Sequence, residues 1–228
     1  MIINNADIIR EKRKTLKITI NKEGKLIVFC PVNLSIEKIN NILTQKEKLI
    51  NKKIKSIQNN NNKYASIFHF KKTLLFGKEY YIIPTEKVNK FFFTEDSLLI
   101  PKKHMELSKI KYYIKKNFKE IAKKVIIKRV VELYKLNNIK IKNYNNISIG
   151  NFKRKWGSCD NLGNIKLNWK LVMLEPQIID FVIHHELIHL IELNHSKNFY
   201  NLLQKSCPEW KIYRNKLKEM SFLLDIYD

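Results

Sequence analysis

The stretch His185-Glu186-Leu187-Ile188-His189, followed by Asn194-His195, determines more about this chain than any other segment. In an α-helix each residue turns about 100°, so His185 and His189 lie on one face, one turn apart. Both imidazoles can therefore reach a single metal ion, while Glu186 lies beside them without crowding it. The spacing predicts a catalytic zinc site with one ion per chain, in which the glutamate takes a proton from a zinc-bound water.

A catalytic zinc site uses a third protein ligand, and His195 is the preferred candidate. An unbroken helix would carry His195 about 15 Å beyond His185, so the helix must end soon after His189 and the chain must turn back. We expect Asn194 to make this turn in the left-handed conformation. Glu192 stays open as an alternative third ligand, because a carboxylate three residues after His189 also suits helical spacing.

An ordinary amphipathic helix with surface histidines is the competing interpretation of this pattern. The segment is apolar on most faces, which predicts a buried helix. Its apolar residues are Phe181, Val182, Ile183, Leu187, Ile188, Leu190 and Ile191. Buried imidazoles and a buried carboxylate need partners, and a metal ion would supply them. We therefore favour metal binding. His184 points about 100° away from His185, so we interpret it as a structural residue or as one that supports the metal ligands without touching the metal.

The residues before this helix predict a β-hairpin beside the metal site. Strand-like segments around Trp156 and Trp169 flank the turn 160–163. A strand edge next to the metal helix would let an extended substrate dock through main-chain hydrogen bonds. We therefore expect Arg154, Lys155 and Trp156 to contact substrate, with the alternative that the two tryptophans are simply core residues.

These motifs together resemble the YgjP-like metallopeptidase-domain family, a relative of the SprT-like and WLM metalloprotease domains. The resemblance covers essentially the whole chain and is carried by Lys155-Trp156-Gly157-Ser158-Cys159, Leu167-Asn168-Trp169, Pro176, His185 to His189, Asn194-His195-Ser196, Phe199-Tyr200 and, more weakly, Arg10, Arg13, Lys14 and Gly24. It implies zinc ligands at His185, His189 and His195, with Glu186 as the base. The same resemblance implies UTP pyrophosphatase activity as an alternative. Lys155 stands where the family has arginine, which keeps the charge but loses bidentate recognition, and Tyr200 stands where tryptophan is usual.

The chain of 228 residues carries a formal net charge of +23, from 44 Lys and Arg against 21 Asp and Glu. Such a charge favours acidic partners, including nucleic acid. Lysine dominates and is spread along a chain that is also rich in Ile and Asn, so a compositional bias is the competing explanation. No apolar run is long enough for a transmembrane helix, and the first residues lack the order of a signal peptide. Three scattered cysteines imply no disulfide framework, so we expect a cytoplasmic protein away from membranes, of undetermined oligomeric state.

The periodicities predict an α+β fold: a strand-rich N-terminal region with one helix over 1–104, then a mostly helical, zincin-like catalytic region with a β-hairpin over 105–228. The expected strands cover 8–20 and 25–30, and short strands lie near 68, 74–76, 80–83, 91–93 and 98–100. The expected helices cover 35–56, 106–136, 197–205 and 208–224, besides the metal helix that starts at Glu175-Pro176. The polar stretch 59–62 is expected to be a loop.

Three functions fit these patterns. The first is a zinc-dependent metallohydrolase, most simply a metallopeptidase that acts on a peptide or protein substrate with Glu186 as general base. The second is a nucleoside triphosphate pyrophosphohydrolase, in which Arg154 and Lys155 hold phosphates. The third is a basic nucleic-acid-binding protein with a structural zinc, although structural sites are usually closed by four ligands.

Overall fold

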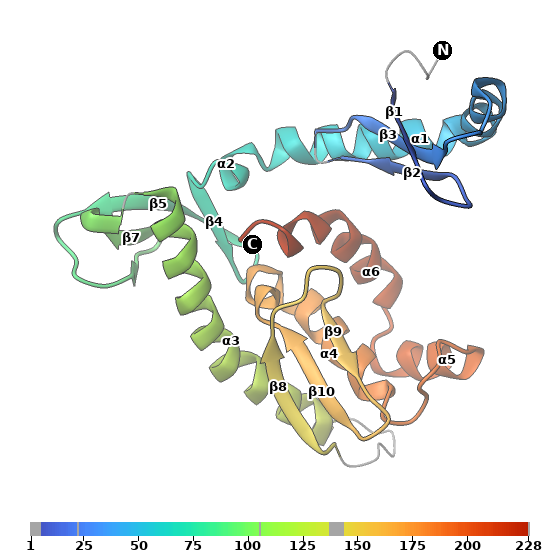
Figure 1. Cartoon of the computed structure of the whole chain (residues 1–228). Coiled ribbons are helices and arrows are strands. Elements are labelled where there is room, and N and C mark those ends of the chain that lie inside the picture. The colour runs from blue at the N-terminus through green and yellow to red at the C-terminus, as the bar shows by residue number, and fades with distance from the viewer. Residues whose placement is uncertain (1–5, 22, 105, 137–143, 228) are drawn as a thin grey trace. The chain divides into compact units, whose positions relative to one another are not determined.

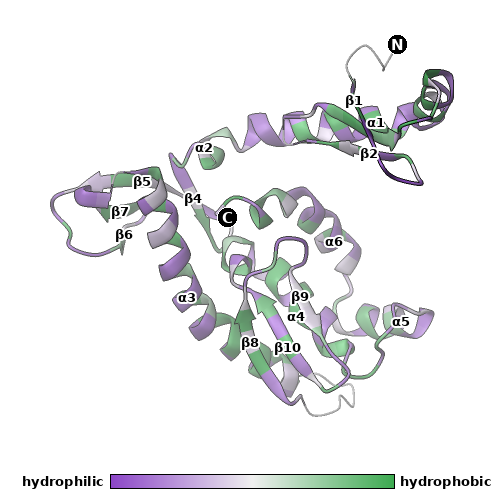
Figure 2. Ribbon diagram, in the orientation of Figure 1, coloured by the Kyte–Doolittle hydropathy of each residue, from purple (hydrophilic) through white to green (hydrophobic). Residues whose placement is uncertain are grey.

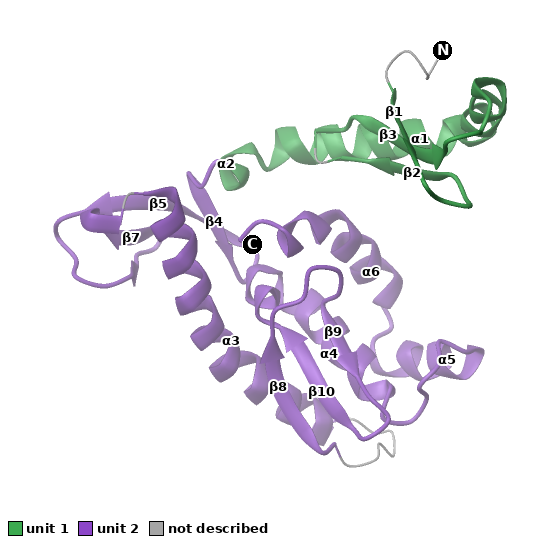
Figure 3. Cartoon of the chain, viewed as in Figure 1, with its two compact units in different colours: residues 1–68 green, residues 69–228 purple. Residues whose placement is uncertain are grey.

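The computed structural model describes residues 6–21, 23–104, 106–136 and 144–227. It divides the chain into two compact units, residues 1–68 and 69–228 (Figures 1 and 3). Both units combine helices with sheets, which confirms the predicted α+β class. None of the helices in the described ranges combines the length and apolar character that a bilayer-spanning segment requires. The sequence-based expectation for residues 1–5, which concerned a signal peptide, lies outside the described residues.

The first unit is a three-stranded sheet covered by one long helix. Its strands are β1 (Ala6–Glu11), β2 (Lys17–Ile20) and β3 (Leu26–Pro31), in the order β1-β3-β2. β1 runs parallel to β3 and β2 antiparallel to it, so the strand predicted over 8–20 is two strands on opposite edges of β3. Alternate residues of β3 are buried and form a core with buried residues of α1 (Ile36–Lys63). The strand contributes Leu26, Val28 and Cys30, and the helix contributes Ile39, Leu43 and Ile50.

Helix α1 begins where the sequence predicted, because the Ser35 side chain accepts a hydrogen bond from the Lys38 N–H. Two predictions at its far end are wrong. The helix continues through 59–62 to Lys63, and α2 (Ala65–Phe68) follows where a strand was expected. Asparagine disfavours a helix by less than about 1 kcal/mol relative to alanine, and no glycine or proline interrupts this segment. Figure 2 shows hydrophilic and hydrophobic residues mixed along α1, as expected for a helix covered on one side.

The second unit contains two sheets. One has the order β4-β5-β7-β6 and is built from β4 (Lys72–Leu75), β5 (Lys78–Thr85), β7 (Ser97–Pro101) and β6 (Phe92–Phe93). The other has the order β8-β10-β9 and is built from β8 (Asn146–Gly150), β10 (Asn164–Asn168) and β9 (Gly157–Cys159). β9 and β10 form the predicted antiparallel hairpin, whereas β8, which pairs parallel with β10, was not predicted. β9 is therefore the edge strand of its sheet.

The helices of the second unit surround this smaller sheet (Figure 1). They are α3 (Leu107–Leu136), α4 (Pro176–Ile188), α5 (Lys197–Ser206) and α6 (Trp210–Glu219), with short 3-10 helices η2 (Lys102–His104), η3 (Trp169–Met173) and η4 (Met220–Leu224). α3 buries one residue about every four and packs against η3, α4 and β8. Trp169 is fully buried beside Phe118, so it is a core residue.

The chain passes from the first unit to the second between residues 68 and 69. The sheet of β4 to β7 belongs with the rest of the second unit because its first hairpin bonds to η3. The Phe76 N–H donates to the Val172 carbonyl at 2.6 Å, and Thr73 Oγ1 lies 2.9 Å from Tyr227 Oη. At Gly77, which has a φ of 79°, an added Cβ would lie 2.7 Å from Glu175 Cγ. This hairpin therefore abuts the start of α4.

Candidate metal centre

Helix α4 carries the His-Glu-x-x-His segment and ends where the ten-residue spacing requires. It starts with Pro176 in its first turn and ends at Ile188, with His189 as the C-cap. The chain then tightens, because the Leu190 N–H bonds to the Leu187 carbonyl at 3.1 Å, one residue closer than in an α-helix. The prediction that Asn194 adopts the left-handed conformation is wrong, since its φ is not positive. A 3-10-like turn makes the reversal without strain.

The reversal brings three imidazoles together. His185 Nε2 lies 3.0 Å from His195 Nε2 and 3.3 Å from His189 Nε2. The ligand atoms of the three residues all lie within 4.8 Å of one another, and they form the one such group of His, Cys, Asp or Glu found in the described residues. Tetrahedral zinc with Zn–N bonds near 2.0–2.1 Å would separate two ligand nitrogens by about 3.3 Å. The donor set and its spacing therefore fit a zinc ion.

The protonation states of these histidines also suit a metal. His189 Nδ1 lies 3.0 Å from the Glu192 carbonyl oxygen, which can only accept, so Nδ1 carries the proton and Nε2 keeps its lone pair. Burial lowers the pKa of His189. Burial, followed by the neighbouring charges of His189, His195 and Arg214, lowers the pKa of His185 to about 3. Both imidazoles are thus neutral at physiological pH, as metal ligands must be.

The carboxylate of Glu192 does not join this cluster. Its Oε2 accepts a hydrogen bond from Asn198 Nδ2 at 3.2 Å, and the residue acts on the site only through its main-chain oxygen. The geometry therefore favours His195 over Glu192 as the third donor. Glu192 supports the site from outside by orienting His189.

Phe199 holds the three imidazoles in place. Its ring is fully buried, and its centroid lies 4.9, 4.8 and 4.7 Å from those of His185, His189 and His195. The position of Phe199 is set by the start of α5, where Ser196 Oγ accepts a hydrogen bond from the Phe199 N–H at 3.2 Å. In the sequence, Phe199 stood out only as one of the residues that carry the family resemblance. Its spacing of four residues from His195 is the signal that connects it to the site.

Glu186 lies against the backbone of strand β9. Its side chain is 5% exposed, and an added Cβ on Gly157 would lie 2.5 Å from Glu186 Oε1 and 2.8 Å from Glu186 Cδ. Only glycine permits this close approach. Burial raises the pKa of Glu186 to about 8, and the charge of Lys155 opposes that rise. Gly157 therefore makes space for the Glu186 carboxylate, a role that the sequence did not reveal.

A cavity of about 550 Å³ opens beside this centre. His185, Glu186 and His195 line it on one side. All three residues predicted to contact substrate also line it, namely Arg154, Lys155 and Trp156. The sequence did not indicate the contribution of α6 and η4, which comprises Trp210, Arg214, Leu217, Lys218, Ser221 and Leu224. Their spacing of three and four residues marks one helical face, which was the available signal.

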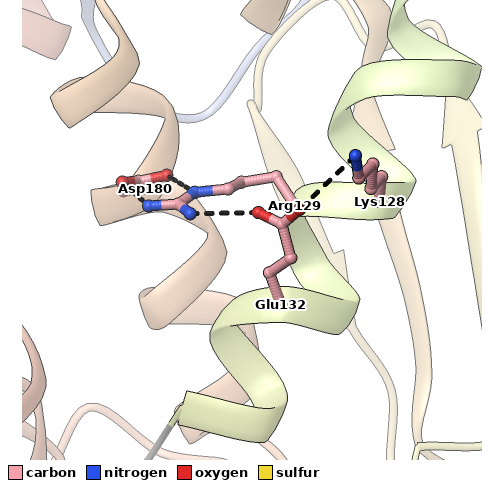
Figure 4. A network of polar contacts seen from close by, with 4 residues as sticks. All are labelled: Lys128, Arg129, Glu132 and Asp180. Atoms are coloured by element: carbon pink, nitrogen blue, oxygen red, sulfur yellow. Dashed lines mark hydrogen bonds and ion pairs between the residues drawn. The ribbon is translucent and has the colours of Figure 1, made fainter.

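The N-terminal half of α4 is fixed to α3 by a bidentate ion pair (Figure 4). Arg129 Nε and Nη2 donate to the two carboxylate oxygens of Asp180 at 2.8 and 2.7 Å. Arg129 Nη1 also donates to Glu132 at 3.1 Å, and Lys128 lies 3.9 Å from the same carboxylate group. These contacts raise the pKa of Arg129, chiefly through the hydrogen bond with Asp180. The pair fixes the position of α4 against α3.

His184 lies outside the imidazole cluster. Its Nδ1 is buried and has no hydrogen-bond partner among the described residues. Burial lowers the pKa of His184, while the charge of Asp180 raises it and that of Arg129 lowers it. This partly buried histidine is therefore neutral and lies between Asp180 and His185 along helix α4.

Comparison with known proteins gave two matches. The model of a family described as YgjP-like, metallopeptidase domain, matches residues 14–220. The crystal structure of the metallopeptidase zymogen of Methanocaldococcus jannaschii jannalysin is 27% identical, with a TM-score of 0.34, over 41% of this chain and 96% of that chain. No curated protein matches this chain.

Proposed function

This chain belongs to the YgjP-like metallopeptidase-domain family, and from that premise we propose that it is a zinc-dependent peptidase with Glu186 as general base. Membership of the family makes the protein a metal-dependent hydrolase. The identity of the metal, the role of the glutamate and the peptide substrate are our proposals. We assign one zinc ion per chain to His185, His189 and His195.

One observation carries the proposal: three imidazoles converge beside a buried carboxylate at the wall of an open cavity. A structural zinc site is usually closed by a fourth protein ligand, whereas a catalytic site keeps one position open. In the described residues the group has three members, and two of them face the cavity. This arrangement supports catalysis over a structural role.

Zinc, when bound, supplies a Lewis acid that activates water near neutral pH and polarises a substrate carbonyl. Glu186 is placed to accept a proton from the attacking water and to pass it to the leaving amine. Its position against Gly157 removes the freedom to turn away from the cavity.

The substrate is proposed to lie along strand β9. This strand pairs with β10 on one side only, and its first residue, Gly157, lines the cavity. An extended peptide can add to such an edge through main-chain hydrogen bonds. Trp156 is 9% exposed and lines the same cavity, so we propose that it contacts the peptide together with Arg154 and Lys155.

A nucleoside triphosphate pyrophosphohydrolase is the second candidate, and the cations at the cavity are the observation in its favour. Triphosphate chemistry also needs carboxylates that hold magnesium. The described residues contain no acidic group of three beside this cavity. We therefore rank peptide hydrolysis first. A basic nucleic-acid-binding protein with a structural zinc ranks third, because the cavity and the buried Glu186 have no purpose in it.

The test is zinc content measured together with hydrolysis. We expect about one zinc per chain in the purified protein, and its loss or loosening in His195→Ala. Glu186→Gln is expected to keep the zinc and to lose about 10²- to 10⁴-fold in the hydrolysis of peptides. Absence of metal after zinc reconstitution, or full peptidase activity in Glu186→Gln, would overturn the proposal. Hydrolysis of UTP but of no peptide would move the second candidate to first place.

A further inference from the structure

The arginines of this chain divide into two groups. There are five, Arg10, Arg13, Arg129, Arg154 and Arg214. The first three are engaged: Arg10 donates to the carbonyls of Val32 and Leu34, Arg13 pairs with Glu11, and Arg129 pairs with Asp180. In the described part of the chain neither Arg154 nor Arg214 forms an ion pair or a side-chain hydrogen bond. Both line the cavity beside the metal centre.

The charged residues that line the cavity are mostly positive. Arg154, Lys155, Arg214 and Lys218 line it, and Glu186 is the one acidic residue among the described lining residues. Glu186 is committed to the metal centre and is packed against Gly157. Neither Lys155 nor Lys218 forms an ion pair within the described ranges. Four cations therefore face one cavity without a protein anion to neutralise them, and such a cavity concentrates anionic ligands.

The two arginines come from different elements, and Arg214 lies beside an aromatic ring. Arg214 lies on α6, and its guanidinium carbon is 5.9 Å from the centroid of the Trp210 ring. Arg154 precedes edge strand β9, next to Trp156. A guanidinium group presents paired N–H donors that match the two oxygens of a carboxylate. The cavity thus offers planar recognition of a carboxylate next to apolar walls.

We propose that the cavity selects peptide substrates that carry a carboxylate, which Arg154 and Arg214 hold while β9 and the metal centre hold the peptide bond. This inference rests on the proposed peptidase function and specifies its substrate class. The carboxylate is either an acidic side chain or the free C-terminus of the peptide, because both present the same group. Apolar lining from Phe181, Leu203, Trp210 and Leu217 suits the neighbouring side chain of a peptide.

The experiment measures binding separately from turnover. The zinc-loaded Glu186→Gln protein is titrated with four probes: a peptide blocked at both ends, the same peptide with one aspartate, the same peptide with a free C-terminus, and UTP. Trp156 and Trp210 line the cavity, so their fluorescence reports occupancy. We expect at least one carboxylate peptide to bind about tenfold or more tightly than the blocked peptide, with a preference that weakens as salt is added. Which of the two carboxylate peptides gains identifies the source of the group.

Variants then locate the preference. The Arg154→Gln, Arg214→Gln double variant is expected to bind all three peptides alike, and Arg214→Lys to keep part of the preference because it keeps the charge. Lys205→Gln is the matched control, since it removes one charge from an exposed position on α5 outside the cavity. Equal binding of the acidic and blocked peptides, or a preference that survives the double variant, would overturn the inference. Arginine-dependent binding of UTP without binding of either acidic peptide would overturn it as well.

These results separate the inference from the proposed function. Hydrolysis of blocked and acidic peptides at equal rates by the wild-type enzyme, with no preference in binding, leaves a peptidase and removes the carboxylate selection. Arginine-dependent binding of acidic peptides by a protein that hydrolyses none of them removes the peptidase and leaves a carboxylate-binding site.

Discussion

The two halves of helix α4 bury polar groups in opposite ways. In the N-terminal half, Asp180 receives two hydrogen bonds from Arg129 at 2.8 and 2.7 Å, so its charge is matched within the protein. In the C-terminal half, Glu186 is 5% exposed and lies against the backbone of Gly157, with its pKa raised by burial. One carboxylate is stabilised by the fold, while the other is held in an environment that disfavours its charge.

The difference separates structural from functional polar residues on one helix. The ion pair between Arg129 and Asp180 fixes the position of the helix and has only this structural role. A buried carboxylate and buried imidazoles without matching charges cost stability, and such residues are typical of sites where chemistry or a ligand needs them. Four predictions test this difference. They concern Phe199, which packs against the three imidazoles, and Gly157, which makes space for Glu186. The other two concern the carboxylates of Asp180 and Glu186 and the imidazole of His184, which lies between them in the sequence.

The largest effect is expected from Phe199→Ala. The ring is fully buried and contacts all three imidazoles, so its removal leaves a cavity under the metal centre. We expect a loss of about 3–5 kcal/mol in the free energy of unfolding. Zinc affinity should fall about 10- to 100-fold, as for other residues that orient metal ligands. Urea unfolding and competition with a zinc chelator measure the two quantities.

Two further variants serve as controls for the Phe199→Ala prediction. Phe92→Ala removes an equal side chain that is 55% exposed and should change stability by less than about 0.5 kcal/mol. Phe199→Leu keeps most of the buried volume, so it should stay folded and still bind zinc more weakly. Unchanged zinc affinity in a folded Phe199→Leu protein would show that the ring does not position the imidazoles.

The second effect is expected from Gly157→Ala. The new Cβ would overlap Glu186 Oε1, and because β9 is tied to β10 by main-chain hydrogen bonds, the glutamate must move. A displacement of about 1 Å at a reacting group costs about 100-fold in rate. We expect that loss in kcat with zinc content unchanged. Gly150→Ala is the matched control, since its Cβ would meet the flexible side chain of Lys166 and not Glu186, and equal losses in both variants would contradict this prediction.

The third prediction exchanges each carboxylate of α4 for an amide. Asp180→Asn should lower the free energy of unfolding by about 1–2 kcal/mol, because a charged bidentate pair at a partly exposed position is weakened. Glu186→Gln should have the opposite sign in the metal-free protein. The folded-state pKa of about 8 lies above the ordinary value, so the folded state holds the proton more tightly and wild-type stability falls as pH rises from about 4.5 to 8.

The measurement is urea unfolding of the metal-free proteins across this pH range. The difference between Glu186→Gln and wild type should grow in favour of the variant up to about pH 8, whereas the deficit of Asp180→Asn should stay constant between about pH 7 and 8. Destabilisation by Glu186→Gln at pH 8 would remove the contrast between the two halves of the helix.

Much of the metal centre could be predicted because its signal is local. The spacing of His185 and His189 fixes their common face, and the distance to His195 forces the helix to end. The same reasoning could not find Gly157 or Arg214, because their roles depend on which strand and helix pack against α4. Those contacts join residues that are far apart in the chain, and periodicity carries no information about them.

The fold was predicted where periodicity is strong and missed where propensity is weak. The long helix α3 was expected over 106–136 and covers Leu107–Leu136. Strand β8 was missed because it needs β10 as a parallel partner. The end of α1 was missed because asparagine disfavours a helix only slightly.

The smallest effect is expected at His184, which lies between the two halves of α4. Burial is the largest influence on its pKa and lowers it, Asp180 raises it and Arg129 lowers it, so the folded state resists protonation. A histidine with a lowered pKa contributes stability above its ordinary pKa near 6.5, and this contribution is lost as pH falls below that value. His184→Gln cannot titrate, so its stability should decline less than that of wild type as pH falls from 7 towards 5. In Asp180→Asn the pKa of His184 should fall further, because the opposing charge is gone, and the decline below pH 6.5 should steepen. Parallel stability curves for wild type and His184→Gln would show that His184 gains a partner for its proton on acidification.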